Sequence, residues 1–278
     1  MSGFNVLQPG VLSLIQDAGR FGQHGIGLTN GGPLDASAMQ IANLLLGNSP
    51  SAAVIEVSFG GLELEALCDT AIAYTGGDAA ISINGEERSS WRSYAVRAGD
   101  RISIGFATQF CRSYIAVADG FTIAEQFGSA STVVREGIGG TSGEKLSKGE
   151  LLSCAGKTDA ELLSLNADDI PAYSDEICVR IVPGYQIKSF SRLQQRRFFS
   201  SVYSVTDRAD RMGYRLEGPA IECDIEGILS EGICHGAVQI PADGQPIVLL
   251  NDRQTIGGYP KIGAALSLDT AKLSQLTP

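Results

Sequence analysis

The most informative stretch of the sequence runs from Cys234 to Ile262 and reads CHGAVQIPADGQPIVLLNDRQTIGGYPKI. Its apolar run, Pro246 to Leu250, is bounded by turn-forming residues and is too short for a helix, so it predicts a buried strand. Amides, carboxylates and glycines crowd both ends of this strand. Such loops are typical of a binding surface on a rigid sheet, and equally of a Gly-rich hairpin region whose polar side chains satisfy turn backbones.

Short apolar segments also recur closely between Val54 and Val117. They predict strands at 54–59, 62–67, 71–74, 80–83, 93–97, 101–106 and 112–117, with Asn84-Gly85 as a hairpin turn. Short strands at this spacing favour a barrel or a sandwich over alternating strands and helices. A second strand-rich region opens at 177–182.

Few helices are expected. The clearest is 36–46, where Asp35 is a good N-cap and Gly47 ends an apolar stripe. Further helices are predicted at 158–165, within 188–201, and at 270–278 with Asp269 as its cap. We predict a mainly β protein with an N-terminal domain at 1–118, a Gly/Ser-rich connecting segment at 119–172 and a C-terminal domain at 173–278.

Composition limits the functional classes. The 278 residues carry a net charge of -10, so the chain lacks the basic footprint of a nucleic-acid-binding protein. No apolar run is long enough to span a membrane, which predicts a soluble, cytoplasmic protein. The six scattered cysteines are expected to be buried thiols in a reducing compartment.

Common catalytic motifs are absent. Gly156-Lys157-Thr158 resembles the end of a phosphate-binding loop, but Leu151 stands where the leading glycine is required. The two histidines, His24 and His235, lie in no nucleophile elbow and are too few for a zinc site. No metal is therefore expected.

A Gly-rich loop near the N-terminus contains Gln16-Asp-Ala-Gly-Arg20 and Gly31-Gly-Pro-Leu-Asp35. Glycines allow sharp turns and close approach of a ligand to the backbone. Asp17 and Arg20 either form a pair that closes this loop or contribute to a site, and the residues alone do not decide between these alternatives.

Three blocks together carry a resemblance to a known family. They are Gln16–Arg20 with Gly31–Asp35 and Ile41–Leu45, then Arg211–Leu216, and finally Gly244–Val248 with Asp252–Pro260. The chain resembles the 5-oxoprolinase C-subunit family, also called biotin-dependent carboxyltransferase or allophanate hydrolase subunit 2. The order of the blocks matches over nearly the whole chain. One departure is Ala118-Asp119-Gly120, where the family usually has a double glycine.

The resemblance implies two cyclophilin-like β-barrel halves with a cleft between them, and a further strand beyond Pro278 that would close the second barrel. It also implies a smaller partner, a B-type subunit homologous to a kinase inhibitor, and an A-type subunit for complete turnover. In this interpretation the complex uses ATP, shared with the smaller partner, to activate the lactam of 5-oxo-L-proline for cleavage to glutamate.

Residue chemistry then suggests roles as hypotheses. Arginine offers a fixed fork to phosphate or carboxylate, and an aspartate orients a lactam N–H. The predicted catalytic residues are Asp17, Arg20, Arg211 and Asp252. The predicted substrate-binding residues are Gln239, Gln245, Gln254, Thr255, Gly257, Gly258, Tyr259 and Arg215.

Two alternatives remain open. The same surface suits the carboxyltransferase component of a urea-type carboxylase, with biotin carried by a separate protein. It also suits a regulator without enzymatic activity that binds a kinase-inhibitor-like partner.

Overall fold

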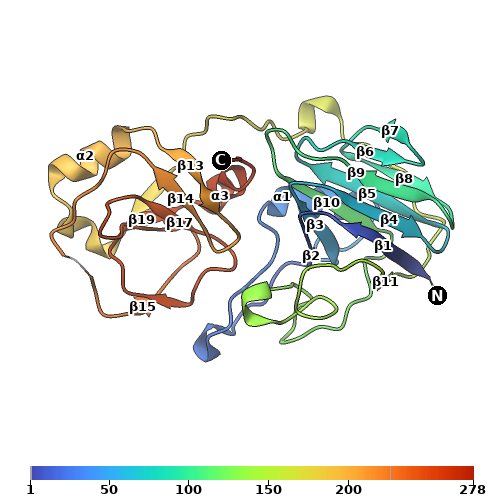
Figure 1. Ribbon diagram of the computed structural model, residues 1–278, viewed down its shortest axis with the longest axis horizontal. Helices are drawn as coiled ribbons and strands as arrows, with labels where there is room; N and C mark the ends of the chain where they lie inside the picture. Colours follow the sequence, from blue (N-terminus) through green and yellow to red (C-terminus); the bar gives the residue numbers. More distant parts are fainter. Residues whose placement is uncertain (1, 226) are drawn as a thin grey trace. The chain divides into compact units, whose positions relative to one another are not determined.

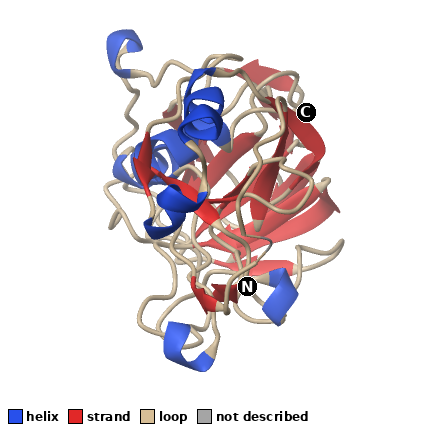
Figure 2. Cartoon of the chain, turned by 90° about the vertical axis from the view of Figure 1, so that its left-hand side faces the viewer, coloured by secondary structure: helices blue, strands red, loops and turns tan. Residues whose placement is uncertain are grey.

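The computed structural model describes residues 2–225 and 227–278, which form a mainly β chain (Figures 1 and 2). The prediction of a mainly β fold is confirmed. The chain divides into two compact units. The first contains residues up to Phe21 and Gly31–Asp175, and the second contains Gly22–Asn30 and Glu176–Pro278.

The first unit contains two antiparallel sheets. One has the strand order β11-β1-β4-β9-β6-β7 and the other β2-β3-β10-β5-β8. The bounds are β1 Gly3–Pro9, β2 Leu12–Gln16, β3 Val54–Ser58, β4 Leu62–Ala66, β5 Thr70–Gly76, β6 Ile81–Ile83, β7 Glu86–Arg88, β8 Arg92–Val96, β9 Arg101–Ile104, β10 Arg112–Val117 and β11 Leu151–Ser153. Every strand predicted between 54 and 117 is present.

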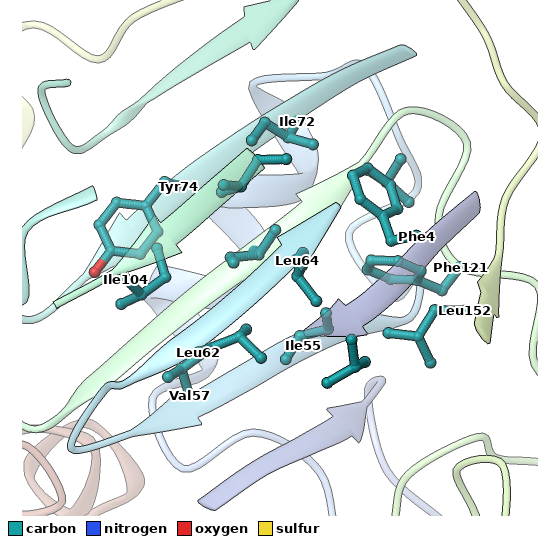
Figure 3. Close-up of a cluster of buried hydrophobic side chains, with 14 of the residues drawn as sticks. Phe4, Ile55, Val57, Leu62, Leu64, Ile72, Tyr74, Ile104, Phe121 and Leu152 are labelled. Atoms are coloured by element: carbon teal, nitrogen blue, oxygen red, sulfur yellow. The ribbon is translucent and has the colours of Figure 1, made fainter. Parts of the chain in front are cut away.

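A single apolar core joins these two sheets (Figure 3). Phe4 and Leu64 from one sheet lie in the same buried cluster as Ile55 and Ile72 from the other. Alternate strand residues point to the same face, so each sheet contributes its inward-facing set. The first unit is therefore built as a sandwich of sheets.

Helix α1, Ala36–Leu44, packs on the β2-β3-β10-β5-β8 sheet through a second apolar cluster. The predicted cap is confirmed, because Asp35 Oδ1 accepts a hydrogen bond of 3.1 Å from the Ala38 N–H. Asn43 is buried on this helix and donates to the Ala52 carbonyl oxygen at 2.9 Å. Its amide thus fixes the chain that follows the helix.

The helix predicted at 158–165 is wrong. The Ser93 hydroxyl accepts a hydrogen bond from the Leu163 N–H at 2.7 Å and donates one to the Leu163 carbonyl at 3.2 Å. The Leu165 N–H donates to the Trp91 carbonyl at 2.9 Å. Strand β8 is the last strand of its sheet, and an uncovered edge exposes unsatisfied backbone groups. The segment is extended because it covers that edge.

The second unit has a six-stranded sheet ordered β12-β19-β16-β17-β14-β13 and a two-stranded pair, β15-β18. The bounds are β12 Ile181–Pro183, β13 Ser204–Ala209, β14 Gly213–Glu217, β15 Glu231–Gly232, β16 Ala237–Gln239, β17 Ile247–Leu249, β18 Ile256–Gly257 and β19 Lys261–Ala265. The buried strand predicted at 246–250 is β17. Its helices are α2 Arg192–Ser200 and α3 Ser267–Leu273. The short 3-10 helices of the chain are η1 His24–Ile26, η2 Val134–Glu136, η3 Ala167–Asp169 and η4 Tyr185–Ser189.

The predicted capping role of Asp269 is also wrong. Helix α3 begins at Ser267 after Leu266, so Asp269 lies inside its first turn. The Asp269 carboxylate instead accepts three hydrogen bonds from Arg180, each 2.8 Å long. These bonds hold the pKa of Asp269 below its usual value. The last helix is thereby tied to the chain that enters β12.

The cysteines only partly match the expectation of buried thiols. Cys111 and Cys154 are buried, whereas Cys178 and Cys234 are exposed. No disulfide links the six, and the sulfur atoms of Cys68 and Cys154 lie 3.9 Å apart.

Two glycines of the first unit allow a matched test of backbone constraint. Gly60 has φ +94°, and an added Cβ would lie 1.9 Å from the Gly105 carbonyl oxygen. Gly85 has φ +81° with open space around it. We expect Gly85→Ala to lower the free energy of unfolding by about 1–2 kcal/mol, the cost of the left-handed conformation, and Gly60→Ala to lower it by more than about 4 kcal/mol. Urea unfolding measures both, and equal losses would contradict the proposed clash.

Candidate functional site

Asp17 follows β2 and organises the loop that the first sequence block encodes. Its carboxylate accepts hydrogen bonds from the hydroxyls of Ser129 and Ser131, both 2.6 Å, and from the Ala130 N–H at 2.6 Å. The Gly19 N–H donates to the same carboxylate at 2.9 Å. Four donors therefore hold one carboxylate, which ties β2 to residues 129–131.

Arg20 is fully buried beside it. Its Nε donates to the Gln126 carbonyl at 2.9 Å, and Nη2 donates to the carbonyls of Ser129 and Ser131 at 3.3 and 3.1 Å. A buried guanidinium is tolerated only when its N–H groups find acceptors. The structure thus brings Asp17 and Arg20 onto one segment, residues 126–131, where both shape the loop.

A buried chain of hydrogen bonds fixes the second half of this region. Glu56 accepts from the Leu34 N–H and from the Tyr114 hydroxyl, both at 2.8 Å. The Tyr114 oxygen in turn accepts from the Asp35 N–H at 2.8 Å, and Asp35 Oδ2 accepts from the Tyr173 hydroxyl at 2.6 Å. Burial, reinforced by the neighbouring carboxylates, holds the pKa of Tyr114 well above 10, so this hydroxyl stays protonated as a donor.

Glu56, Tyr114 and Tyr173 are not among the site residues predicted from the sequence. The sequence holds a usable signal, because Glu56 stands inside the apolar run Val-Ile-Glu-Val, and the structure buries all five residues of β3. A carboxylate in the middle of a buried strand needs specific donors, so it marks a polar site inside a core.

In the second unit, Arg211 and Asp252 form a buried ion pair. Arg211 Nε and Nη2 donate to the two carboxylate oxygens of Asp252, each at 2.9 Å. The side chains are 5% and 7% exposed. Main-chain bonds run beside the pair, since the Asp252 N–H donates to the Arg211 carbonyl at 3.0 Å. The pair locks the turn after β17 to the turn before β14.

This pair can be tested by isosteric replacement. Asp252→Asn leaves the Arg211 cation buried without its counter-charge, so we expect the free energy of unfolding to fall by about 3–5 kcal/mol. The double variant Arg211→Met with Asp252→Leu removes both charges and is expected to lose less. Denaturant unfolding of the three proteins is the measurement, and a double variant less stable than Asp252→Asn would contradict the interpretation.

Arg253, next in the chain, is also buried. Its Nε donates to the Ile233 carbonyl at 3.1 Å and Nη1 to the Leu250 carbonyl at 3.3 Å. The positive charge of Arg253 acts on His235, whose Nε2 forms a hydrogen bond of 2.8 Å with the Thr270 hydroxyl. Burial, with a smaller contribution from the Arg253 charge, lowers the pKa of His235 from 6.5 to about 4. His235 is therefore neutral at pH 7.

Neutral burial of His235 gives a pH dependence with a definite sign. The folded pKa lies below the unfolded one, so the unfolded chain binds more protons between pH 6.5 and 4. The contribution of His235 to stability is then complete above pH 6.5 and is lost as the pH falls. We expect about 2 kcal/mol more loss between pH 7 and pH 5 in the wild type than in His235→Gln. Unfolding curves at both pH values test this, and identical pH dependence would contradict it.

The predicted substrate-binding residues have different environments. The Gln245 amide is engaged with the main chain, accepting from the Gly218 N–H at 2.9 Å and donating to the Gly218 carbonyl at 3.1 Å. Gln239 is buried, and its Nε2 lies 3.0 Å from where a Cβ on Gly257 would stand. Gln254 and Tyr259 are exposed, whereas Arg215, Thr255 and Gly258 are intermediate. Gln239 and Gly257 are thus brought together, and Gln245 is committed to its own turn.

Neither a metal cluster nor a membrane-spanning helix is found in the described chain. Among residues 2–225 and 227–278, no group of three or more His, Cys, Asp or Glu side chains could hold a metal ion. Within the same residues, the helices are too short or too polar to cross a membrane.

Comparisons with known proteins agree with this organisation. The family model described as "Carboxyltransferase domain, subdomain A and B" matches residues 26–278. The 5-oxoprolinase C subunit of Escherichia coli (strain K12) is 34% identical over 274 residues, which cover 98% of this chain and 87% of the relative. The urea amidolyase of Saccharomyces cerevisiae is 29% identical over 297 residues, covering 100% of this chain and 16% of that enzyme.

Solved structures show the same likeness. The crystal structure of the Kluyveromyces lactis urea carboxylase matches 99% of this chain with a TM-score of 0.92 and 26% identity, over 26% of its own length. That of the K. lactis urea amidolyase matches with a TM-score of 0.92 over 18% of its length. The chain therefore belongs to the family of carboxyltransferase domains built from subdomains A and B. The relatives that it matches over most of their length include 5-oxoprolinase C subunits.

Proposed function

We propose that this chain is the C subunit of an ATP-dependent 5-oxoprolinase. The observation that carries the proposal is the match to the E. coli 5-oxoprolinase C subunit over 87% of that relative, whereas the matched urea amidolyase of S. cerevisiae is covered over only 16% of its length. The chain would act in the cytoplasm with a smaller B-type subunit, homologous to a kinase inhibitor, and with an A-type subunit. Together they would cleave the lactam of 5-oxo-L-proline to glutamate.

The chemistry explains why ATP is required. A lactam is a poor acyl donor because its nitrogen is a poor leaving group. Transfer of the γ-phosphoryl group to the carbonyl oxygen releases ADP and activates the ring carbon. One water then adds to that carbon, and the C–N bond breaks to open the ring and leave an acyl phosphate. A second water hydrolyses the acyl phosphate to the glutamate carboxylate and inorganic phosphate. Such a sequence demands positioning and charge stabilisation more than a protein nucleophile.

We place the nucleotide contacts on one of the partner proteins. The donor groups of Arg20 reach carbonyl oxygens of the chain, and those of Arg211 reach Asp252. These two arginines are engaged within the chain and are poorly placed to bind a phosphate group. We propose that they hold loops in place instead of taking part in catalysis. Arg215 is only partly buried and remains the arginine of the predicted set best suited to a substrate carboxylate.

Lactam recognition is assigned to the amide of Gln239. An uncharged amide offers both a donor and an acceptor, which matches the C=O and N–H of a small cyclic amide. Gly257 lets the main chain pass close to the Gln239 amide, because an added Cβ would lie 3.0 Å from Gln239 Nε2 and 2.5 Å from Ile233 Cδ1. Tyr259, 47% exposed, follows on the same loop and offers an aromatic face.

A second candidate function has its own support. The family model and the urea carboxylase structure both concern carboxyltransferase domains, and the ureido ring of biotin is also a small cyclic amide. In that case a separate biotinylated protein would deliver the ring to the same amide groups.

Co-expression with an A-type and a B-type protein tests the proposal. We expect ATP hydrolysis that depends on 5-oxoproline and yields glutamate, with no activity from the single chain. Gln239→Leu in the complex should lower kcat/KM by about 10- to 100-fold, the effect of losing one buried polar contact, while Gln109→Leu in an exposed loop should match the wild type. Turnover by the single chain, or carboxyl transfer to urea with a biotinylated partner, would contradict the proposal.

A further inference from the structure

Cys68 and Cys154 place their sulfur atoms side by side at one end of the first sheet. The two Sγ atoms are 3.9 Å apart, although the residues are separated by 86 positions in the sequence. Cys68 follows β4 and Cys154 follows β11, and these strands lie on either side of β1 (Figure 1). The sulfur atoms therefore meet beyond the start of the strand that separates their own strands.

The main chain beside both cysteines is held by hydrogen bonds. The Leu67 N–H donates to the Gly3 carbonyl at 2.9 Å, and the Cys154 N–H donates to the Ser2 carbonyl at 3.3 Å. Cys154 also forms an antiparallel bridge with Phe121. The short distance between the two sulfur atoms is therefore set by the pairing of the sheet.

This separation suits a disulfide bond. Sulfur atoms 3.9 Å apart are in contact, and rotation of the two side chains has to bring them closer by about 2 Å to form the bond. The chain opposite leaves room for this movement, because even a Cβ added at Gly156 would lie 3.5 Å from Cys68 Sγ.

The two thiols differ in exposure, and this difference orders their chemistry. Cys68 is half-buried, whereas Cys154 is buried. Burial, with a smaller contribution from the neighbouring Cys68 thiol, raises the pKa of Cys154 from 9.0 to about 11, so this thiol is protonated at pH 7. An oxidant that arrives from solvent meets Cys68 first, and Cys154 stands where it can react with the oxidised product.

We propose that Cys68 and Cys154 form a redox-sensitive site that closes to a disulfide when hydrogen peroxide is the oxidant. Peroxide first oxidises the Cys68 thiol to a sulfenic acid and releases one water. The Cys154 sulfur then attacks the Cys68 sulfur, the S–O bond breaks, and the hydroxide leaves with the Cys154 proton as a second water. Two thiols and one peroxide thus give one disulfide and two waters. The inference does not depend on the proposed function.

The bond would fasten a weakly held part of the sheet. Strand β11 has three residues and lies at the edge of its sheet, and short edge elements are among the first to open locally. The Thr122 N–H donates to the Ser153 carbonyl of β11 at 2.9 Å. The chain continues from there to residues 126–131, the segment that binds Asp17 and Arg20. A bond from Cys154 to the end of β4 would stabilise the base of that segment.

Peptide mapping after peroxide treatment tests the inference. Cleavage after Lys and Arg places Cys68 alone on residues 21–88 and Cys154 alone on residues 149–157. The full chain is treated with hydrogen peroxide, alkylated in denaturant and digested. We expect these two peptides to be joined, lighter than their sum by two hydrogen atoms, and to separate with dithiothreitol. The melting temperature of the oxidised protein should rise by about 5 °C or more and return after reduction.

Two variants provide matched controls. Cys68→Ser removes the half-buried thiol of the pair and should lose both the joined peptide and the rise in melting temperature. Cys178→Ser removes an exposed thiol outside the pair and should keep both. Mapping of the wild type carries the test even when Cys68→Ser folds poorly.

Three results would overturn the inference. One is a wild type in which Cys68 becomes a sulfinic acid while Cys154 is alkylated. Another is a disulfide formed by Cys178 or Cys234 while both members of the pair are alkylated. The third is a joined peptide in a protein whose melting temperature does not rise, because the bond would then strain the fold instead of fastening it.

Discussion

The buried ion pair between Arg211 and Asp252 holds together the part of the second unit in which the distinctive sequence blocks converge. Taking a charged group out of water costs several kcal/mol unless a partner replaces the lost hydration. Two parallel hydrogen bonds of 2.9 Å meet that demand. Because either residue alone would be an uncompensated buried charge, the turns before β14 and after β17 must stay together for the fold to persist.

The first unit obeys the same constraint with different groups. Asp17 collects hydroxyl and amide donors, Arg20 collects carbonyl acceptors, and Glu56 is satisfied by Tyr114 and a main-chain amide. These charged residues, two in a Gly-rich loop and one in β3, therefore serve to hold the neighbouring loop backbone in one conformation. Groups that contact a small ligand are then expected among uncharged side chains such as Gln239, whose environment these loops determine.

Much of the fold could be predicted because local physics dominates it. Short apolar segments at close spacing predicted the strands between 54 and 117, and the cap at Asp35 predicted the start of α1. The prediction of a helix at 158–165 was wrong because the backbone of this segment pairs with β8, which is distant in the sequence. The prediction that Asp269 caps the last helix was wrong for a similar reason, because Arg180 binds its carboxylate. The charged candidates could be chosen from the chemistry of their side chains. Whether each one is buried depends on tertiary packing, which residue type does not encode.

Asp119 lies at a corner where the backbone takes an angle that glycine adopts more easily than other residues. It has φ +64° and is followed by Gly120 at φ +77°, so an aspartate adopts the left-handed conformation expected of glycine. The side chain adds a contact that glycine lacks, because Lys157 Nζ lies 3.2 Å from its carboxylate, and the Asp119 N–H still donates to Asn48 at 2.8 Å. The bend therefore requires a left-handed backbone angle, and the residue that supplies it here also ties the corner to Lys157 and Asn48.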